Sequence, residues 1–215
     1  MRPVIPVEVL SVQYLPNADP ALCRSLGVQG NWRCLGLLSA DSDDVTYIAL
    51  DEATKKADCR VAYAKSFYAG AANASTALAG EVIGILAGPS PAEVTAGLRA
   101  AAAFARENGF RSANADDSVV YFAHTVSSTG TYLSRLAQVR EGEALAYLIA
   151  PPLEAMVGLD AALKASDVEL KTFYAPPSET NFGGGLLTGT QSACRAACEA
   201  FAEAVTQVAA APREV

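Results

Sequence analysis

The sequence contains little positive charge. Lys and Arg number 16 against 23 Asp and Glu, so the formal net charge is −7 and the isoelectric point lies near 4.8. Nucleic-acid phosphates are bound by clustered Lys and Arg side chains, and this chain has no basic patch. Its single histidine, His124, comes without a Walker loop or a dinucleotide-binding fingerprint. We therefore expect neither a nucleic-acid partner nor an enzyme.

Long apolar runs and a regular cysteine framework are also missing. No run reaches the roughly 18 apolar residues that a membrane span needs, and residues 1–6 lack the apolar segment of a secretory signal. The five cysteines are odd in number and have no framework spacing, which is typical of a reducing cytosol. Cys194 and Cys198, one helical turn apart, are expected to be buried as small hydrophobes. We predict a cytoplasmic protein.

The sequence does contain an internal repeat. Three segments recur in the same order, at offsets that fall from 109 to 106 to 101: 51–58 with 160–167, 67–69 with 173–175, and 84–88 with 185–189. Falling offsets with a constant order are expected when two copies differ only in loop length. A repeat determines the whole architecture, so we predict two homologous domains, residues 1–111 and 112–215.

Each copy alternates strand-like and helix-like segments. In the first copy, hydrophobic alternation predicts strands near 7–12, 34–39, 59–67 and 81–87. Helices are predicted from Asp19-Pro20, from an Asp43 or Asp44 cap to about residue 57, and from Ser90-Pro91 with a Glu93 capping box to residue 107.

The second copy repeats the plan. Strands are predicted at 119–126, 144–150, 168–174 and 186–187, with helices near 132–137, from 151–152 to 165, and at 191–209. Strands alternating with helices favour an α/β (α+β) fold, in which each domain is a small sheet flanked by helices.

Several segments resemble a known family. Residues 154–168 resemble the signature helix of bacterial microcompartment (BMC) shell domains. More narrowly, four blocks are similar to the shell proteins of ethanolamine utilisation: residues 35–47, 68–72, 150–155 and 176–181. The similarity covers about residues 2–212.

The resemblance implies two tandem, circularly permuted BMC domains and a structural, pore-forming shell protein. Three copies would form a flat homotrimer, a pseudo-hexamer with a gated central pore and a small pore within each subunit. A two-module chain that closes as a cyclic trimer presents six similar modules, which agrees with a hexagonal tile. The implied partners are further copies, other microcompartment shell proteins and small polar metabolites, with no required cofactor. The implied location is the shell of a microcompartment in the cytoplasm.

An acidic cluster is the first candidate site. Asp41, Asp43, Asp44 and Glu81 could surround a cation, but helix capping and solvated charge explain the same residues. The resemblance implies that the small pore, between the two modules, holds ethanolamine. The matching positions are Asp43, Asp44, Glu81, Phe110, Thr180, Asn181 and Phe182.

The resemblance also implies a zinc site at His124 and Glu154. Two ligands fall short of the three or four usual for zinc, although trimer symmetry could gather others. A lone histidine on a strand is more often a hydrogen-bonded structural residue.

Two further features follow from the resemblance. Lys55 and Lys164 match the edge lysine that contacts neighbouring tiles, although either could be an ordinary solvated helix charge. The loop at 65–75 is rich in Gly, Ala and Ser and would gate the central pore, unless it is an ordinary flexible connection. Its gating residues are Ser66, Phe67, Tyr68, Ala69 and Gly70.

Two other functions compete with a shell role. Tandem α/β domains often house ligands, so a small-molecule sensor or binding module is the main alternative. An enzyme ranks third, because Asp43, Asp44 and Glu81 could perform acid–base chemistry. Assembly separates the first two, since a shell protein forms trimers and sheets.

Overall fold

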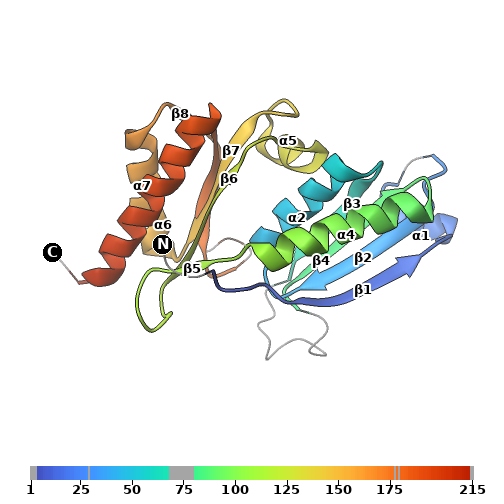
Figure 1. Ribbon diagram of the computed structural model, residues 1–215, viewed down its shortest axis with the longest axis horizontal. Coiled ribbons are helices and arrows are strands. Elements are labelled where there is room, and N and C mark those ends of the chain that lie inside the picture. Colours follow the sequence, from blue (N-terminus) through green and yellow to red (C-terminus); the bar gives the residue numbers. More distant parts are fainter. Residues whose placement is uncertain (1–3, 29, 68–79, 177, 179, 214–215) are drawn as a thin grey trace. The chain divides into compact units, whose positions relative to one another are not determined.

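The computed structural model describes residues 4–28, 30–67, 80–176, 178 and 180–213. The chain divides into two compact units, each with its own sheet (Figure 1). Unit 2 contains Pro6–Gly109 and Gly130–Leu133, and unit 1 contains Met1–Ile5, Phe110–Thr129 and Ser134–Val215. The predicted division into two homologous domains, residues 1–111 and 112–215, stays a prediction.

Unit 2 is a four-stranded sheet with helices. The strand order is β1-β2-β4-β3 and neighbouring strands are antiparallel. The strands are β1 (Val9–Leu15), β2 (Cys34–Ala40), β3 (Arg60–Ser66) and β4 (Val82–Gly88), and the helices are α1 (Pro20–Ser25), α2 (Asp43–Lys56) and α4 (Pro91–Glu107). Figure 1 shows α2 and α4 side by side on one face of this sheet.

Glycines in the strands let those two helices approach the sheet. A Cβ on Gly36 of β2 would lie 2.5 Å from Val94 of α4, and one on Gly84 of β4 would lie 2.6 Å from Leu50 of α2. The helices therefore pack where the strands have no side chain. On the opposite face, the α1 segment covers a smaller apolar cluster made of Ala18, Cys23, Leu35, Ile85 and Ala87.

Unit 1 is built on the same plan. Its sheet has the order β5-β6-β7-β9-β8, again with antiparallel neighbours. The elements are β5 (Arg111–Ser112), β6 (Val120–Val126), β7 (Ala144–Ala150), α6 (Pro152–Ala165), β8 (Val168–Tyr174), β9 (Gly183–Gly189) and α7 (Gln191–Ala210). Helix α5 (Thr131–Ala137) belongs to this unit only from Ser134 on, because its first turn is part of unit 2. Helices α6 and α7 pack on one another and enclose a core with β7, in which Phe201 is fully buried. Among the described residues, no helix is long and apolar enough to cross a bilayer.

The repeat extends to irregularities of the strands. The register of β3 against β4 shifts between Val61 and Tyr63. That of β8 against β9 shifts between Leu170 and Thr172, which are the equivalent residues of the second copy. The two copies therefore share a bulge as well as a strand order.

The short helices of the two copies also end in the same way. After α1, the N–H of Gly27 donates to the Arg24 carbonyl and the N–H of Val28 to the Cys23 carbonyl. After α5, the same two bonds run from Gln138 to Arg135 and from Val139 to Ser134. This pair of bonds is a Schellman motif, and it aligns the two turns residue by residue.

One of the three repeated segments is misaligned. The structure pairs Ala64 with Gly84 and Phe173 with Gly185, so Phe173 corresponds to Ala64 and not to Phe67. The match of 67–69 with 173–175 is therefore wrong as a structural equivalence. Three identical residues in a row were too short a signal to define the register.

Two predicted caps also differ in detail. The N-cap of α2 is Ser42, and Asp43 and Asp44 lie inside the first turn, where Asp43 Oδ1 accepts from the N–H of Asp44 at 2.8 Å. At α4 the Ser90 side chain does accept from Glu93 N–H, but the Glu93 carboxylate accepts from the N–H of Asp58 at 2.7 Å. Glu93 thus ties α4 to the end of α2 instead of closing a capping box.

Candidate functional site

The predicted carboxylates gather at one end of the unit 2 sheet. Asp43 and Asp44 follow β2 and are buried, each with 8% exposure. Glu81 directly precedes β4, and its N–H donates to the Ala40 carbonyl at the end of β2 at 2.9 Å. Asp41, which follows β2 directly, accepts from the N–H of Glu8 at 2.8 Å. The strand pairing of β2 with β4 therefore collects acidic residues that are distant in the sequence.

The electrostatics of this cluster favour a positive charge. Burial raises the pKa of Glu81, and the charges of Asp43 and Asp41 raise it further. Burial also raises the pKa of Asp41, with a smaller contribution from Glu8. Like charges held together in a partly desolvated position disfavour their own ionised forms. A cation nearby would relieve that cost.

The other residues predicted to bind ethanolamine lie in unit 1, and the structure brings them together there. The ring of Phe110 lies 5.6 Å from Phe182 and 5.4 Å from Phe122, measured between centroids. Thr180 is buried, and its hydroxyl accepts from the N–H of Phe182 at 3.2 Å. Asn181 belongs to the same turn, which is closed by the bond from the N–H of Ser178 to the Phe182 carbonyl at 3.0 Å. An aromatic pair and a polar turn thus form one local group.

The two predicted zinc ligands, His124 and Glu154, lie on a strand and on a helix of unit 1. His124 lies on β6 and its ring stacks on Phe122 at 5.7 Å, while Glu154 lies in the first turn of α6. Across the described part of the chain, no group of three or more His, Cys, Asp or Glu residues could hold a metal ion. The zinc prediction therefore depends on ligands from other copies.

The two predicted edge lysines differ in exposure. The side chain of Lys164 is 74% exposed and forms an ion pair with Asp160 at 2.6 Å. That of Lys55 is 21% exposed and contacts Glu52 and Asp51, the latter at 3.8 Å. Lys164 is the one that is accessible on the surface of a single chain.

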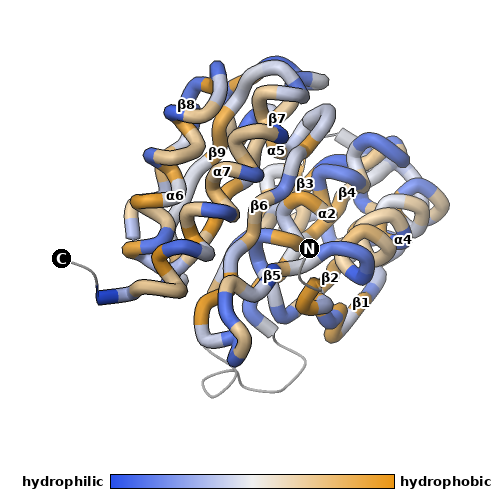
Figure 2. Tube along the Cα trace, turned by 60° about the vertical axis from the view of Figure 1, so that its left-hand side comes forward, coloured by the Kyte–Doolittle hydropathy of each residue, from blue (hydrophilic) through white to orange (hydrophobic). Residues whose placement is uncertain are grey.

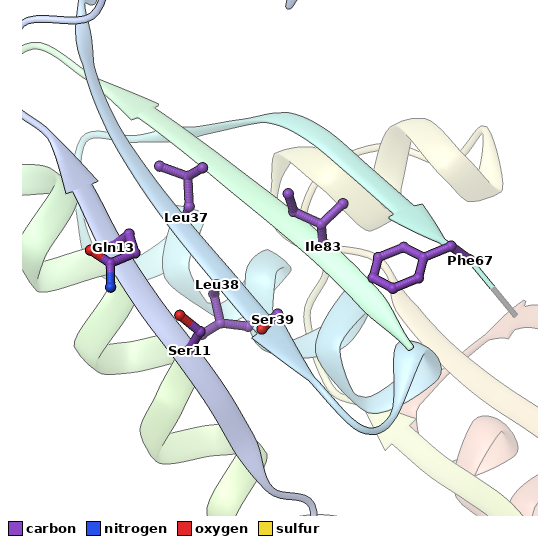
Figure 3. Close-up of a pocket in the computed structure, with 7 residues that line it drawn as sticks. All are labelled: Ser11, Gln13, Leu37, Leu38, Ser39, Phe67 and Ile83. Atoms are coloured by element: carbon purple, nitrogen blue, oxygen red, sulfur yellow. The ribbon is translucent and has the colours of Figure 1, made fainter. Parts of the chain in front are cut away.

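The predicted gating loop is described at its start. Ser66 ends β3, where its N–H donates to the Tyr47 hydroxyl at 2.7 Å, and the N–H of Phe67 donates to the Glu81 carbonyl at 3.0 Å. Figure 3 shows Phe67 beside Ile83, with Leu37 farther across the open face of the sheet, and all three line a depression of about 280 Å³. Tyr68, Ala69 and Gly70, and the rest of the loop to residue 75, lie outside the described residues.

The sequence did not predict the structural role of the carboxylate of Asp51. Asp51 of α2 has 0% exposure, and it accepts from the N–H groups of Gly130 at 2.7 Å, Tyr132 at 3.1 Å and Leu133 at 2.8 Å. These are the first-turn donors of α5, so Asp51 caps a helix that is distant in sequence. The available signal was Gly130, which precedes a predicted helix but has no capping side chain.

The cysteines fit the expected structural role. All five are free and buried. Burial raises the pKa of Cys198 to about 12, and its sulfur receives a contact from the Thr125 hydroxyl at 3.4 Å. A thiol that stays protonated is a poor nucleophile and a poor metal ligand.

Comparison with known proteins agrees with this architecture. The family model of the BMC domain matches residues 34–116. The bacterial microcompartment shell protein EutL of Clostridium perfringens (strain 13 / Type A) is 64% identical over 206 residues, which cover 95% of both chains. EutL of Escherichia coli K12 is 51% identical over 207 residues, covering 95% of this chain and 94% of the relative.

A solved structure agrees as well. The crystal structure of the ethanolamine utilization protein EutL from Leptotrichia buccalis has a TM-score of 0.97 and 63% identity, over 100% of this chain and 99% of that one. The expected mixed fold and the family resemblance are therefore confirmed. These relatives are shell proteins, so the role is structural and not catalytic. The chain belongs to the EutL family of bacterial microcompartment shell proteins.

Proposed function

We propose that three copies of the chain close into a flat, pseudo-hexagonal tile of a microcompartment shell that handles ethanolamine. The internal repeat supports this proposal, because two similar units per chain generate six similar units in a cyclic trimer. The tile joins other shell proteins along its edges and lets small polar metabolites cross.

Lys164 is the edge residue that we propose to test. Its side chain is 74% exposed, so reversing its charge leaves the fold of the chain unchanged within about 0.5 kcal/mol. Lys164→Asp is expected to keep the trimer mass in solution and to abolish flat sheets in electron micrographs. Arg140→Asp is the control, since that side chain is also exposed, at 90%, and its charge changes equally. Sheets formed equally well by Lys164→Asp would refute the edge assignment.

The acidic cluster is proposed to bind the ammonium group of ethanolamine. The supporting observation is that Asp43 and Asp44, buried in the first turn of α2, and the partly buried Glu81, which directly precedes β4, gather at one end of the sheet, where the charge of Asp43 raises the pKa of Glu81. The family resemblance also assigns Thr180, Asn181, Phe110 and Phe182 of unit 1 to ligand binding, and their hydroxyl, amide and aromatic groups suit the hydroxyl and hydrocarbon parts of ethanolamine. A cation over an aromatic ring contributes about 0.5–1 kcal/mol where the site is partly exposed.

Binding in a passage should be weak. A tightly held metabolite would obstruct flux, so we expect a dissociation constant near millimolar, about −4 kcal/mol. Calorimetry with ethanolamine should show Glu81→Gln binding several-fold more weakly than the parent, and added salt should weaken both. Glu107→Gln is a matched control, because Glu107 is an exposed residue of the same unit and loses the same charge. If Glu81→Gln and the parent bind ethanolamine equally well, the acidic cluster does not bind the ammonium group, and its carboxylates only cap helices or lie on the surface.

The oligomeric state distinguishes a small-molecule sensor from a shell protein. A binding module that works as a monomer should take up ethanolamine without forming trimers or sheets. Sedimentation showing a stable monomer at micromolar concentration would overturn the tile proposal and leave the ligand test unaffected.

A further inference from the structure

The peptide bond between Asn108 and Gly109 differs from every other bond that follows an asparagine. It is the only place in the sequence where asparagine precedes glycine. Because glycine has no Cβ, its backbone nitrogen can approach the preceding side-chain amide with little steric hindrance. The exposed Asn17 and Asn31 precede alanine and tryptophan, whose side chains hinder that approach. Asn108 is therefore the asparagine whose side-chain amide is best placed to react with the main chain.

This bond lies where α4 ends and the chain passes from unit 2 into unit 1. Asn108 is the C-cap of α4, and Gly109 ends the segment Pro6–Gly109 of unit 2. The helix changes there from an apolar run, residues 100–105, to the hydrophilic residues 106–108 (Figure 2). Residues 106 and 107 are exposed and Asn108 is half-buried. Helix ends fray, so this last turn opens more readily than the interior of the helix.

The folded chain holds Asn108 in an unreactive geometry. Its backbone N–H and its side-chain Nδ2 both donate to the Phe104 carbonyl, at 3.1 and 2.9 Å. Its ψ of 158° is extended, whereas ring closure needs the Gly109 nitrogen turned towards the Asn108 side chain. Gly109 is also buried. The two bonds to Phe104 must therefore break before the side chain and the main chain can react.

We propose that Asn108 is a site of spontaneous deamidation, which proceeds through opening of the last turn of α4. The backbone nitrogen of Gly109 attacks Cγ of Asn108 and loses its proton, while the bond from Cγ to Nδ2 breaks and ammonia leaves. Water then opens the cyclic succinimide at one of its two carbonyls. Opening at the side-chain carbonyl gives aspartate. Opening at the backbone carbonyl gives isoaspartate, whose main chain runs through Cγ.

Both products destabilise the end of α4. A carboxylate has no N–H to donate, so the bond from Nδ2 to the Phe104 carbonyl is lost. The new negative charge lies at a helix C-terminus, which favours positive charge, and directly after Glu107. Isoaspartate also lengthens the main chain before Phe110, whose carbonyl accepts from the N–H of Ile5 at 2.8 Å. We therefore expect modified chains to unfold at a lower temperature than the parent.

Ageing of the full-length protein tests the site. Trypsin cuts after Arg106 and Arg111 and so releases residues 107–111 as one peptide. After incubation at mildly alkaline pH, this peptide should gain the mass of an amide-to-acid conversion and separate into aspartyl and isoaspartyl forms. Peptides that carry Asn17 and Asn31 should stay unchanged in the same sample. An unmodified 107–111 peptide, or equal conversion at Asn17 and Asn31, would overturn the proposal.

Unfolding tests the role of the helix end. The parent should convert faster in urea than in buffer at the same pH, because urea removes the bonds to Phe104. Equal rates in the two solutions would show that opening of α4 does not control the reaction. Asn108→Gln is the control, since its longer side chain closes a larger ring slowly and should stay unmodified.

The variant Asn108→Asp reproduces one product and tests its effect. It should melt below freshly prepared parent protein at neutral pH, and the difference should shrink below the ordinary aspartate pKa of about 3.9, where the carboxyl is protonated. An Asn108→Asp protein as stable as the parent at neutral pH would contradict the proposed weakening of α4.

Discussion

The two sheets share a backbone plan but present different side chains on one face. Gln13 pairs with Leu37 in unit 2, and His124 pairs with Tyr147 at the equivalent position of unit 1. In unit 1 this face is aromatic, and Phe122 and Tyr147 are 2% and 1% exposed. In unit 2 Leu37 lines an open depression together with Phe67 and Ile83 (Figure 3). The repeat therefore conserves strand order, bulge and turns, while the faces have diverged.

The start of the short helix differs in the same way. Asp19 caps α1 with its own side chain, whereas Gly130 leaves the cap of α5 to Asp51. In the first repeat, the helix N-terminus is capped by a residue adjacent in the sequence. In the second repeat, it is capped by a residue from a distant segment. Three substitutions test this contrast at the turns, and a fourth tests the acidic cluster, which only the first repeat has.

Asp51→Ala is expected to have the largest effect. It removes an acceptor from three backbone donors in a buried position, which should lower the free energy of unfolding by about 3 kcal/mol. Urea unfolding followed by circular dichroism measures the loss. Asp58→Ala, at an exposed position of the same repeated segment, should change stability by less than about 0.5 kcal/mol. Equal losses in both variants would contradict the capping role.

Gly130→Ala should have the next largest effect. Its Cβ would lie 2.8 Å from the backbone oxygen of Asp51, and a backbone atom cannot move aside cheaply. We expect a loss of about 1–3 kcal/mol in the same unfolding measurement. An unchanged midpoint would show that the turn can shift away from α2.

Gln138→Gly should stabilise the protein slightly. Gln138 has φ 55° at the position where the first repeat has Gly27 at φ 67°, and its side chain is exposed. Glycine relieves the left-handed strain, so the free energy of unfolding should rise by about 0.5–1 kcal/mol. The reciprocal change Gly27→Gln should lower it by a similar amount, and effects of the same sign in both variants would contradict the equivalence.

Glu81→Gln should have the smallest effect on stability, and a pH-dependent one. Because burial and the nearby carboxylates raise the Glu81 pKa, its stabilising contribution is present below the unfolded pKa of about 4.3. That contribution is lost as pH rises through the higher folded pKa. The variant should therefore melt slightly higher than the parent at neutral pH, within about 0.5 kcal/mol, and equally below pH of about 4. A variant that melts lower at neutral pH would show that the Glu81 charge is stabilising.

The sequence predicted most elements because their signals are local. The strands 144–150 and 168–174 match β7 and β8 at both ends, and Ser90-Pro91 marked the start of α4. The two-residue strand β5 was missed, since two residues carry no periodicity. The sequence alone offered Glu81 and Asp43 as members of one acidic cluster, and the family resemblance implied a ligand for it; the geometry of the cluster comes from the pairing of β2 with β4.

By itself, the sequence determined the repeat, the order of helices and strands, and the acidic character of the chain, because these depend on spacing and composition. Tertiary structure alone decided that Asp51 caps α5, that Phe173 corresponds to Ala64, and that Ile48 is buried where Val157 is exposed. The first and third depend on which distant segment covers a residue, and the second on which residues of neighbouring strands pair. Two repeats with the same local pattern can therefore differ in what lies against them.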